Sequence, residues 1–90
     1  MSRADLNQEQ IVTALRAVGA TVEITTQQGN GFPDLVVGYM KRTHLIEVKN
    51  PETKGKLRAT QEIFRDKWKG SDIHVVNNVD EALQVIGVEV

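Results

Sequence analysis

The sequence predicts a single α/β domain whose elements follow the order helix, strand, strand, strand, helix, strand. A helix is indicated near the start because Ile11 and Leu15 recur at helical spacing, with Ala14 beside them. Strands are indicated by short β-branched runs that alternate, such as Thr21-Val22-Glu23-Ile24-Thr25. The chain has 90 residues, of which 40% are hydrophobic and 26% charged, and this is enough for one hydrophobic core.

The boundaries follow from apolar periodicity and from the glycines and prolines. The predicted elements are a helix at 2–18, strands at 21–25, 35–40 and 43–49, a helix at 59–69, a strand at 73–77 and a helix at 80–86. Val18 is expected on the inward face of the first helix, and Gly19 stands where a helix commonly ends. A turn at Lys41-Arg42 is expected to join the second and third strands, and Val88-Glu89-Val90 offers a further short strand.

Charged residues at one end of the predicted hairpin are the strongest functional signal. Pro33 keeps the chain extended as it reaches Asp34, which opens the second strand. In the third strand Glu47 and Lys49 share one face, while Val48 points to the other. Two nearby carboxylates repel each other unless a cation lies between them. Asp34 and Glu47 are therefore candidate ligands of a hard divalent cation such as Mg²⁺.

The helix at 59–69 places Gln61, Phe64 and Trp68 on one face, at i, i+3 and i+7. We expect the two aromatic residues to pack in the core rather than to stack on bases. The amide of a glutamine in line with them needs a partner, and the acidic site is the obvious candidate. Glu9 lies on the flank of the first helix, where periodicity alone favours a solvated side chain.

The net charge of −1 hides an uneven distribution. Residues 41–69 contain nine basic and four acidic residues, a balance of +5 that leaves −6 for the rest of the chain. A positive segment of this kind suits a surface that faces phosphate, although a solvated helix face and a charged loop give the same composition. The candidate nucleic-acid-binding residues are Lys41, Arg42, Lys54, Lys56, Arg58 and Arg65. Gly55-Lys56 lacks the rest of a phosphate-binding loop, so we expect no nucleotide cofactor.

Composition also bounds the setting of the protein. The chain has no cysteine, which excludes disulfides and thiolate zinc sites. Its start, Met1-Ser2-Arg3-Ala4-Asp5, lacks the apolar run of a signal peptide, and no segment is apolar enough to cross a bilayer. We therefore expect no membrane partner and a cytoplasmic location, with a viral, phage or bacterial host cell as a plausible setting.

Pro33-Asp34 followed by Glu47-Val48-Lys49 resembles the PD-(D/E)xK nuclease signature. The element order is similar to that of the restriction-endonuclease-like core, which has a mixed central sheet. Within this superfamily the chain resembles the VRR-NUC (virus-type replication-repair nuclease) domain from residue 9 to about residue 82. The matching pieces are Gly31-Phe32-Pro33-Asp34-Leu35, Thr43-His44-Leu45-Ile46-Glu47-Val48-Lys49, and Leu57 through Gln61 followed by Trp68. One departure is Arg58-Ala59, which stands where the family usually has a Ser/Thr-Pro helix start.

The resemblance implies metal-dependent hydrolysis of DNA, often selective for branched structures such as flaps or Holliday junctions. The two carboxylates would hold Mg²⁺ or Mn²⁺ with the Val48 carbonyl as a further ligand, and Glu9 matches an acidic residue that the family carries near the metal. Lys49 would position the attacking water or stabilise the charge that develops on the phosphate. Gln61 would orient Lys49 or a water.

Three alternatives remain open from the sequence. A Holliday-junction resolvase of the same superfamily would use the same motif. A non-catalytic nucleic-acid-binding module could keep the fold, although binding alone does not require the four motif residues together. A structural subunit is disfavoured by the uneven charge. We also expect a homodimer, because branched DNA with two equivalent strands calls for two sites related by symmetry, and residues 88–90 offer a surface for pairing.

Overall fold

The computed structural model describes residues 3–49 and 59–90, and these form a mixed α/β domain. Its elements are α1 (Arg3–Ala17), β1 (Thr21–Ile24), the short 3-10 helix η1 (Thr26–Gln28), β2 (Leu35–Tyr39), β3 (Arg42–Val48), α2 (Ala59–Lys67), β4 (Ile73–Val76) and α3 (Val79–Val85). The predicted order of helices and strands is confirmed in the described part of the chain. The predicted loop at 50–58 lies outside the described residues.

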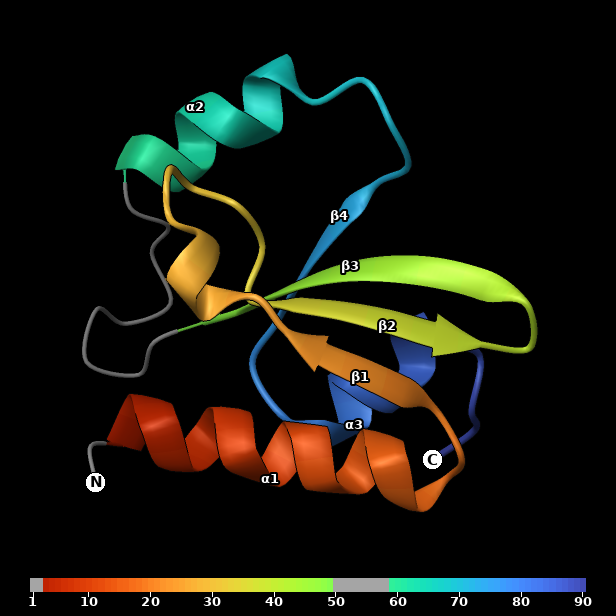
Figure 1. The fold of residues 1–90 in the computed structure, drawn as a ribbon. Coiled ribbons are helices and arrows are strands. Elements are labelled where there is room, and N and C mark those ends of the chain that lie inside the picture. The colour runs from red at the N-terminus through yellow and green to blue at the C-terminus, as the bar shows by residue number, and fades with distance from the viewer. Residues whose placement is uncertain (1–2, 50–58) are drawn as a thin grey trace.

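The four strands form one mixed sheet in the order β1-β2-β3-β4. The first three strands are antiparallel neighbours, whereas β4 runs parallel to β3. Parallel neighbours need a crossover connection, and here the connection contains α2. Figure 1 shows α1 and α3 on one side of the sheet and α2 on the other. The mixed sheet is therefore as predicted.

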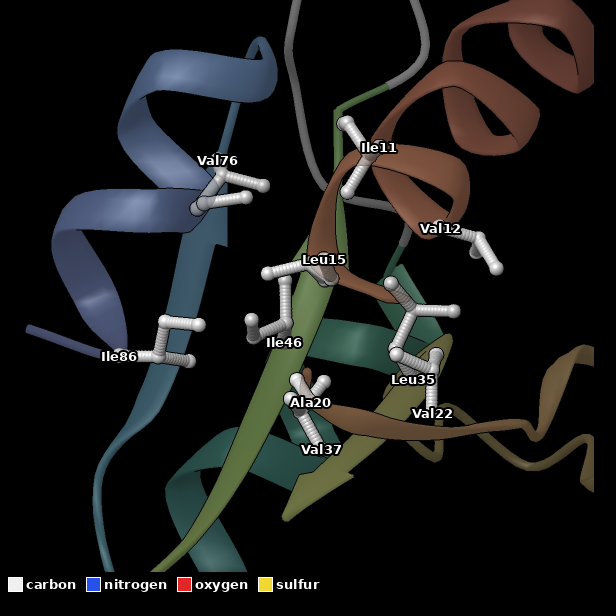
Figure 2. Packing of buried hydrophobic residues seen from close by; sticks show 11 residues of the cluster. Ile11, Val12, Leu15, Ala20, Val22, Leu35, Val37, Ile46, Val76 and Ile86 are labelled. Atoms are coloured by element: carbon white, nitrogen blue, oxygen red, sulfur yellow. The ribbon is translucent and has the colours of Figure 1, made fainter. Parts of the chain in front are cut away.

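The hydrophobic core fills the space between the sheet and the pair α1 and α3. Ile11 and Leu15 of α1 are fully buried and belong to one cluster with Leu35 and Ile46 of the sheet (Figure 2). Ile86, beyond the end of α3, closes this cluster from the other side. Because side chains alternate along a strand, residues 34, 36, 45 and 47 face away from this core.

The first helix ends one residue earlier than predicted, and Gly19 terminates it as expected. Gly19 adopts a positive φ of 98° and donates a hydrogen bond to the Arg16 carbonyl (3.0 Å), while Ala20 donates to the Leu15 carbonyl (3.1 Å). These two bonds form a Schellman motif, which requires a left-handed residue at the position of Gly19. The chain turns at Gly19, directly after Val18, and Val18 is 37% exposed, so the inward position predicted for Val18 is wrong.

The hairpin turn lies at Met40-Lys41, not at the predicted Lys41-Arg42. Both turn residues have positive φ, 52° and 65°, which is the geometry of a tight type I′ connection. Arg42 instead begins β3 and pairs with Tyr39. The sequence lacks the Asn-Gly or Asp-Gly signal of such turns, and this explains the error.

The second helix differs most from its prediction. It ends at Lys67, and none of its residues is buried. Phe64 is half-buried and Trp68, just beyond the helix, is 39% exposed, so the expected packing of these residues in the core is wrong. The spacing predicted correctly that they share a face, but the core lies on the other side of the sheet (Figure 1).

The C-terminal segment packs without forming a strand. Val88 donates a backbone hydrogen bond to the Leu83 carbonyl (3.0 Å) and packs against the core, whereas Val90 is 63% exposed. The short strand expected at residues 88–90 is therefore absent from the sheet that the structure describes. In the same described residues, no helix combines the length and the apolar character needed to cross a membrane.

The start of α3 is held by a polar cluster that also reaches α1. Asn78 accepts a hydrogen bond from the Glu81 backbone N–H (2.9 Å), as a helix N-cap does. The Glu81 carboxylate accepts from the Asn77 backbone N–H (2.7 Å) and from its side-chain amide (2.9 Å). Asn7 of α1 donates to the Asn77 carbonyl (3.1 Å). The cluster thus ties α1, the end of β4 and the start of α3 together.

We predict that this cluster makes part of the folding stability depend on pH. The Asn77 backbone and side-chain donors hold the pKa of Glu81 below its usual 4.5. The folded state therefore favours the ionised carboxylate, and its contribution is present above pH 4.5 and is lost as the pH falls through the lowered pKa. Glu81→Gln should be less stable than the parent at pH 7 and equal to it near pH 3, measured by urea unfolding.

The matched control is Asn78→Ala, which removes an uncharged cap at a cost of about 1 kcal/mol. Its loss should be the same at both pH values. A Glu81→Gln loss that persisted unchanged at low pH would contradict the electrostatic account of this cluster.

Candidate active site

The candidate site lies where β2 begins and where β3 and β4 end. This side of the sheet, formed by strand ends and not by an outer strand, is called here the carboxyl edge. The antiparallel pairing of β2 with β3 brings the start of one beside the end of the other, and the parallel pairing of β3 with β4 brings their ends together. Asp34, which directly precedes β2, and Glu47-Val48-Lys49, at the end of β3, therefore meet at this edge.

Asp34 is held in place by three hydrogen bonds around it. Its side-chain Oδ2 accepts from the Val48 backbone N–H at 2.9 Å. Its carbonyl accepts from the Thr25 backbone N–H at 2.7 Å, and the Thr25 hydroxyl donates to the carbonyl of the buried Pro33 at 2.7 Å. The Val48 bond thus fixes the carboxylate against the end of β3, and the two Thr25 bonds fix the backbone of Pro33 and Asp34 beside the end of β1.

Glu47 is directly across from Asp34 in the strand register. Leu35 pairs with Ile46, so the next pair outward is Asp34 with Glu47, and directly opposed residues of an antiparallel pair project to the same face. The predicted turn at Lys41-Arg42 would have put Lys49 in that position instead. The observed turn therefore brings the two carboxylates together more directly than expected.

Glu47 is only 3% exposed and is the one buried polar or charged side chain among the described residues. Ionised carboxylates are rarely buried to this extent, because removal from water costs several kcal/mol unless a cation or hydrogen bonds compensate. Glu47 is therefore a buried carboxylate at the end of an internal strand, on the face of the sheet that lies away from the core.

Lys49 lies on the other flank of Glu47. Its backbone N–H donates to the Val76 carbonyl at 2.8 Å, which extends the β3–β4 pairing beyond the end of β3. The Lys49 side chain is half-buried. The two hydrogen bonds from Asn77 lower the pKa of Glu81 most, and the positive charge of Lys49 lowers it by a smaller amount. Lys49 is thus in electrostatic range of the polar cluster at the start of α3.

Gln61 is positioned by contact between α2 and the loop that precedes Asp34. Gly31 in this loop lies against the Thr60 carbonyl and close to the Gln61 backbone nitrogen. Phe32 contacts Phe64 edge to face, with 5.5 Å between ring centroids. Gln61 is half-buried at the start of α2, next to the Gly31 contact and one turn before Phe64. The first turn of α2 and the Asp34 loop are therefore one packed unit.

The structure leaves the predicted ligand Glu9 on the surface of α1. It is exposed on α1, which packs against the opposite face of the sheet. Within residues 3–49 and 59–90, no group of three or more His, Asp or Glu side chains is arranged to hold a metal ion. Of the predicted ligands, Asp34, Glu47 and Val48 lie together, whereas Glu9 is left on the solvated flank that periodicity favours.

Among the predicted basic residues that the structure describes, Lys41, Arg42 and Arg65 lie on two separate elements. Lys41 and Arg42 are exposed at the hairpin turn, five strand residues from Asp34, or about 17 Å at 3.4 Å per residue. Arg65 is exposed in the last turn of α2. Lys54, Lys56 and Arg58 lie outside the described residues.

Sequence reasoning missed two groups near the site. One is the Asn7–Asn77–Glu81 cluster, whose members are polar residues from three separate segments. The other is the row of ring contacts from Phe32 through Phe64 to Trp68, of which Trp68 is exposed. Helical spacing signalled the Phe64–Trp68 part of this row, and Asn78 followed three residues later by Glu81 is the pattern of a helix start.

Comparison of the chain with protein-family models, with curated proteins and with solved structures gives no significant match.

We predict that Gly31→Ala loosens the contact between α2 and the Asp34 loop. Gly31 has a φ of 81°, and an added Cβ would collide with the Thr60 carbonyl. Gly87→Ala is the control, because Gly87 also has a positive φ, 89°, but open space where the Cβ would be. The left-handed backbone should cost about 1–2 kcal/mol in the control, and overpacking should cost Gly31→Ala about 1–3 kcal/mol more. Equal losses in urea unfolding would show that this contact is not tight.

Proposed function

We propose that the protein is a divalent-metal-dependent endonuclease that hydrolyses DNA phosphodiester bonds and prefers branched DNA such as flaps or Holliday junctions. The observation that carries the proposal is the hydrogen bond from the Val48 N–H to the Asp34 carboxylate, with Glu47 opposite Asp34 in the strand register. It brings together the residues of the PD-(D/E)xK-like motif at one edge of the sheet. The restriction-endonuclease-like core is part of this proposal, supported by the element order and the mixed sheet.

The donor set suits Mg²⁺ or Mn²⁺. Hard divalent cations take oxygen ligands, and Mg²⁺ commonly uses one or two carboxylates with water in its remaining positions. Asp34 and Glu47 supply two carboxylates. The N–H and carbonyl of one residue in an extended strand point to the same side. The Val48 N–H points to Asp34, so its carbonyl is directed there too and is a suitable third oxygen ligand.

The chain's own residues have distinct roles in this proposal. A cation held by Asp34 and Glu47 would supply Lewis-acid chemistry, activating the attacking water and neutralising phosphate charge. Lys49, fixed through its backbone to Val76, would place an ammonium beside the scissile phosphate and stabilise the charge that develops there. Gln61, held by the packing of α2 on the Asp34 loop, would orient that lysine or the attacking water.

The homodimer remains part of the proposal on grounds of symmetry alone. One domain of this size would cut one strand per encounter, and a two-fold dimer presents two equivalent sites to a branched substrate. The exposed end of the chain at Val90 is available to such an interface, although it does not offer the strand edge that the sequence suggested.

We predict that Glu47→Gln and Lys49→Ala each lower the cleavage rate at least about 100-fold, because each removes a group that acts on the transition state. The measurement is cleavage of end-labelled flap, Holliday-junction and linear duplex DNA in Mg²⁺, Mn²⁺ and Ca²⁺. DNA binding in Ca²⁺ should change by less than about 10-fold, since contacts with phosphate elsewhere supply most of the affinity.

Glu23→Gln is the control, because Glu23 is an exposed glutamate on β1 outside the site. It should cleave like the parent. Full turnover by Lys49→Ala in saturating Mg²⁺ would contradict the assigned site. DNA binding by the parent without cleavage of any substrate would favour the non-catalytic module.

A further inference from the structure

A pocket of about 320 Å³ lies between the end of α2 and the start of β4, away from the core. Arg65 and Trp68 line one side, and residues 70–74 line the other. This volume is at the lower end of the range for small-molecule sites. Its lining combines an indole, a guanidinium, a carboxylate from Asp72 and a hydroxyl from Ser71.

The indole in this wall is held in a fixed position. Trp68 Nε1 donates a hydrogen bond to the Ser71 carbonyl at 2.8 Å. Phe64 stacks on the ring with centroids 5.5 Å apart and planes 21° apart. A Cβ at Gly70 would meet the nitrogen-bearing side of the indole at 2.7 Å, so only glycine leaves the ring room there. Trp68 nevertheless remains 39% exposed, so a rigid aromatic surface faces the pocket and solvent.

The aromatic stack continues from the pocket to the candidate active site. Trp68 contacts Phe64, and Phe64 contacts Phe32 at a further 5.5 Å. Phe32 precedes Asp34 by two residues. A ligand in the pocket is therefore joined to the Asp34 loop by two ring contacts.

We propose that this pocket binds an unpaired base of single-stranded DNA, stacked on Trp68. Surfaces that bind single strands combine aromatic side chains, on which bases stack, with basic residues that follow the backbone. Here Arg65 lines the pocket, and Lys67 and Lys69 are exposed close by on the same segment. Asp72 and Ser71 can exchange hydrogen bonds with the edge of a base. The inference rests on the proposed nuclease function for its choice of DNA, and it names a single-stranded flap as the preferred branch.

Trp68 is the only tryptophan in the chain, so its emission reports on this pocket directly. The experiment titrates the full chain with a short oligothymidylate in EDTA, which prevents metal-dependent cleavage. The expected result is saturable quenching of Trp68 emission. A blunt duplex of the same length should leave the emission unchanged. Unchanged emission at oligothymidylate concentrations that saturate binding by anisotropy would overturn the proposal.

Variants separate stacking from general charge attraction. Trp68→Ala should weaken binding of fluorescein-labelled oligothymidylate about 5- to 150-fold, the range for loss of one base stack. Arg65→Ala and Lys67→Ala each remove one positive charge from the last turn of α2, but only Arg65 lines the pocket. Arg65→Ala should therefore weaken binding several-fold more than Lys67→Ala and should also reduce the quenching. Equal effects of these two variants, or parental affinity in Trp68→Ala, would contradict the pocket.

These results are independent of cleavage. A chain that quenches with oligothymidylate but cleaves no DNA would refute the nuclease proposal and support the pocket. A chain that cleaves flaps while the Trp68 emission stays constant would support the nuclease and refute the pocket.

Discussion

The hydrogen bond from the Val48 N–H to the Asp34 carboxylate is the interaction on which the candidate site depends. It joins the residue that precedes β2 to the last residue of β3, at a point where the strand ladder would otherwise end. The bond fixes one carboxylate oxygen, directs the Val48 carbonyl to the same side, and leaves Glu47 opposite Asp34. Loss of this bond would release the Asp34 carboxylate from the end of β3, while the pairing of Leu35 with Ile46 would still set the backbone register.

The two faces of the sheet differ in what they carry: one face packs in the hydrophobic core, and the other carries the candidate site. Ile46 of β3 points into the core formed with α1 and α3, and its neighbour Glu47 points to the opposite face. Apolar packing on the first face holds β3 as an internal strand, between β2 and β4. Such a strand can position a buried carboxylate rigidly, because both of its edges are hydrogen-bonded. The second face carries the Asp34 loop, and α2 lies on this side of the sheet.

Local patterns were enough to predict the order of the main elements and the shared face of Asp34 and Glu47. Asp34 and Glu47 belong to one hairpin, so strand alternation alone indicates that they share a face. The turn was placed one residue late because Met40-Lys41 adopts left-handed backbone without the residues that usually reveal it. The observed register differs from the predicted one by two residues along β3, so every side chain keeps its predicted face. The error altered only which residue is opposite Asp34. Helical spacing showed that Phe64 and Trp68 share a face, but spacing cannot tell whether a face meets the core. The position of Glu9 and the Asn7–Asn77–Glu81 cluster depend on how distant segments pack, which no local pattern contains.

The central claim is that Asp34 and Glu47 together hold one divalent cation, and Mn²⁺ binding followed by electron paramagnetic resonance tests it most directly. The account predicts a saturable Mn²⁺ site in the parent chain that Mg²⁺ displaces. Asp34→Asn and Glu47→Gln should each weaken this site strongly, while the Glu23→Gln control keeps it. Parental Mn²⁺ affinity in both Asp34→Asn and Glu47→Gln would contradict the account, because it would show that the two carboxylates do not hold a cation together.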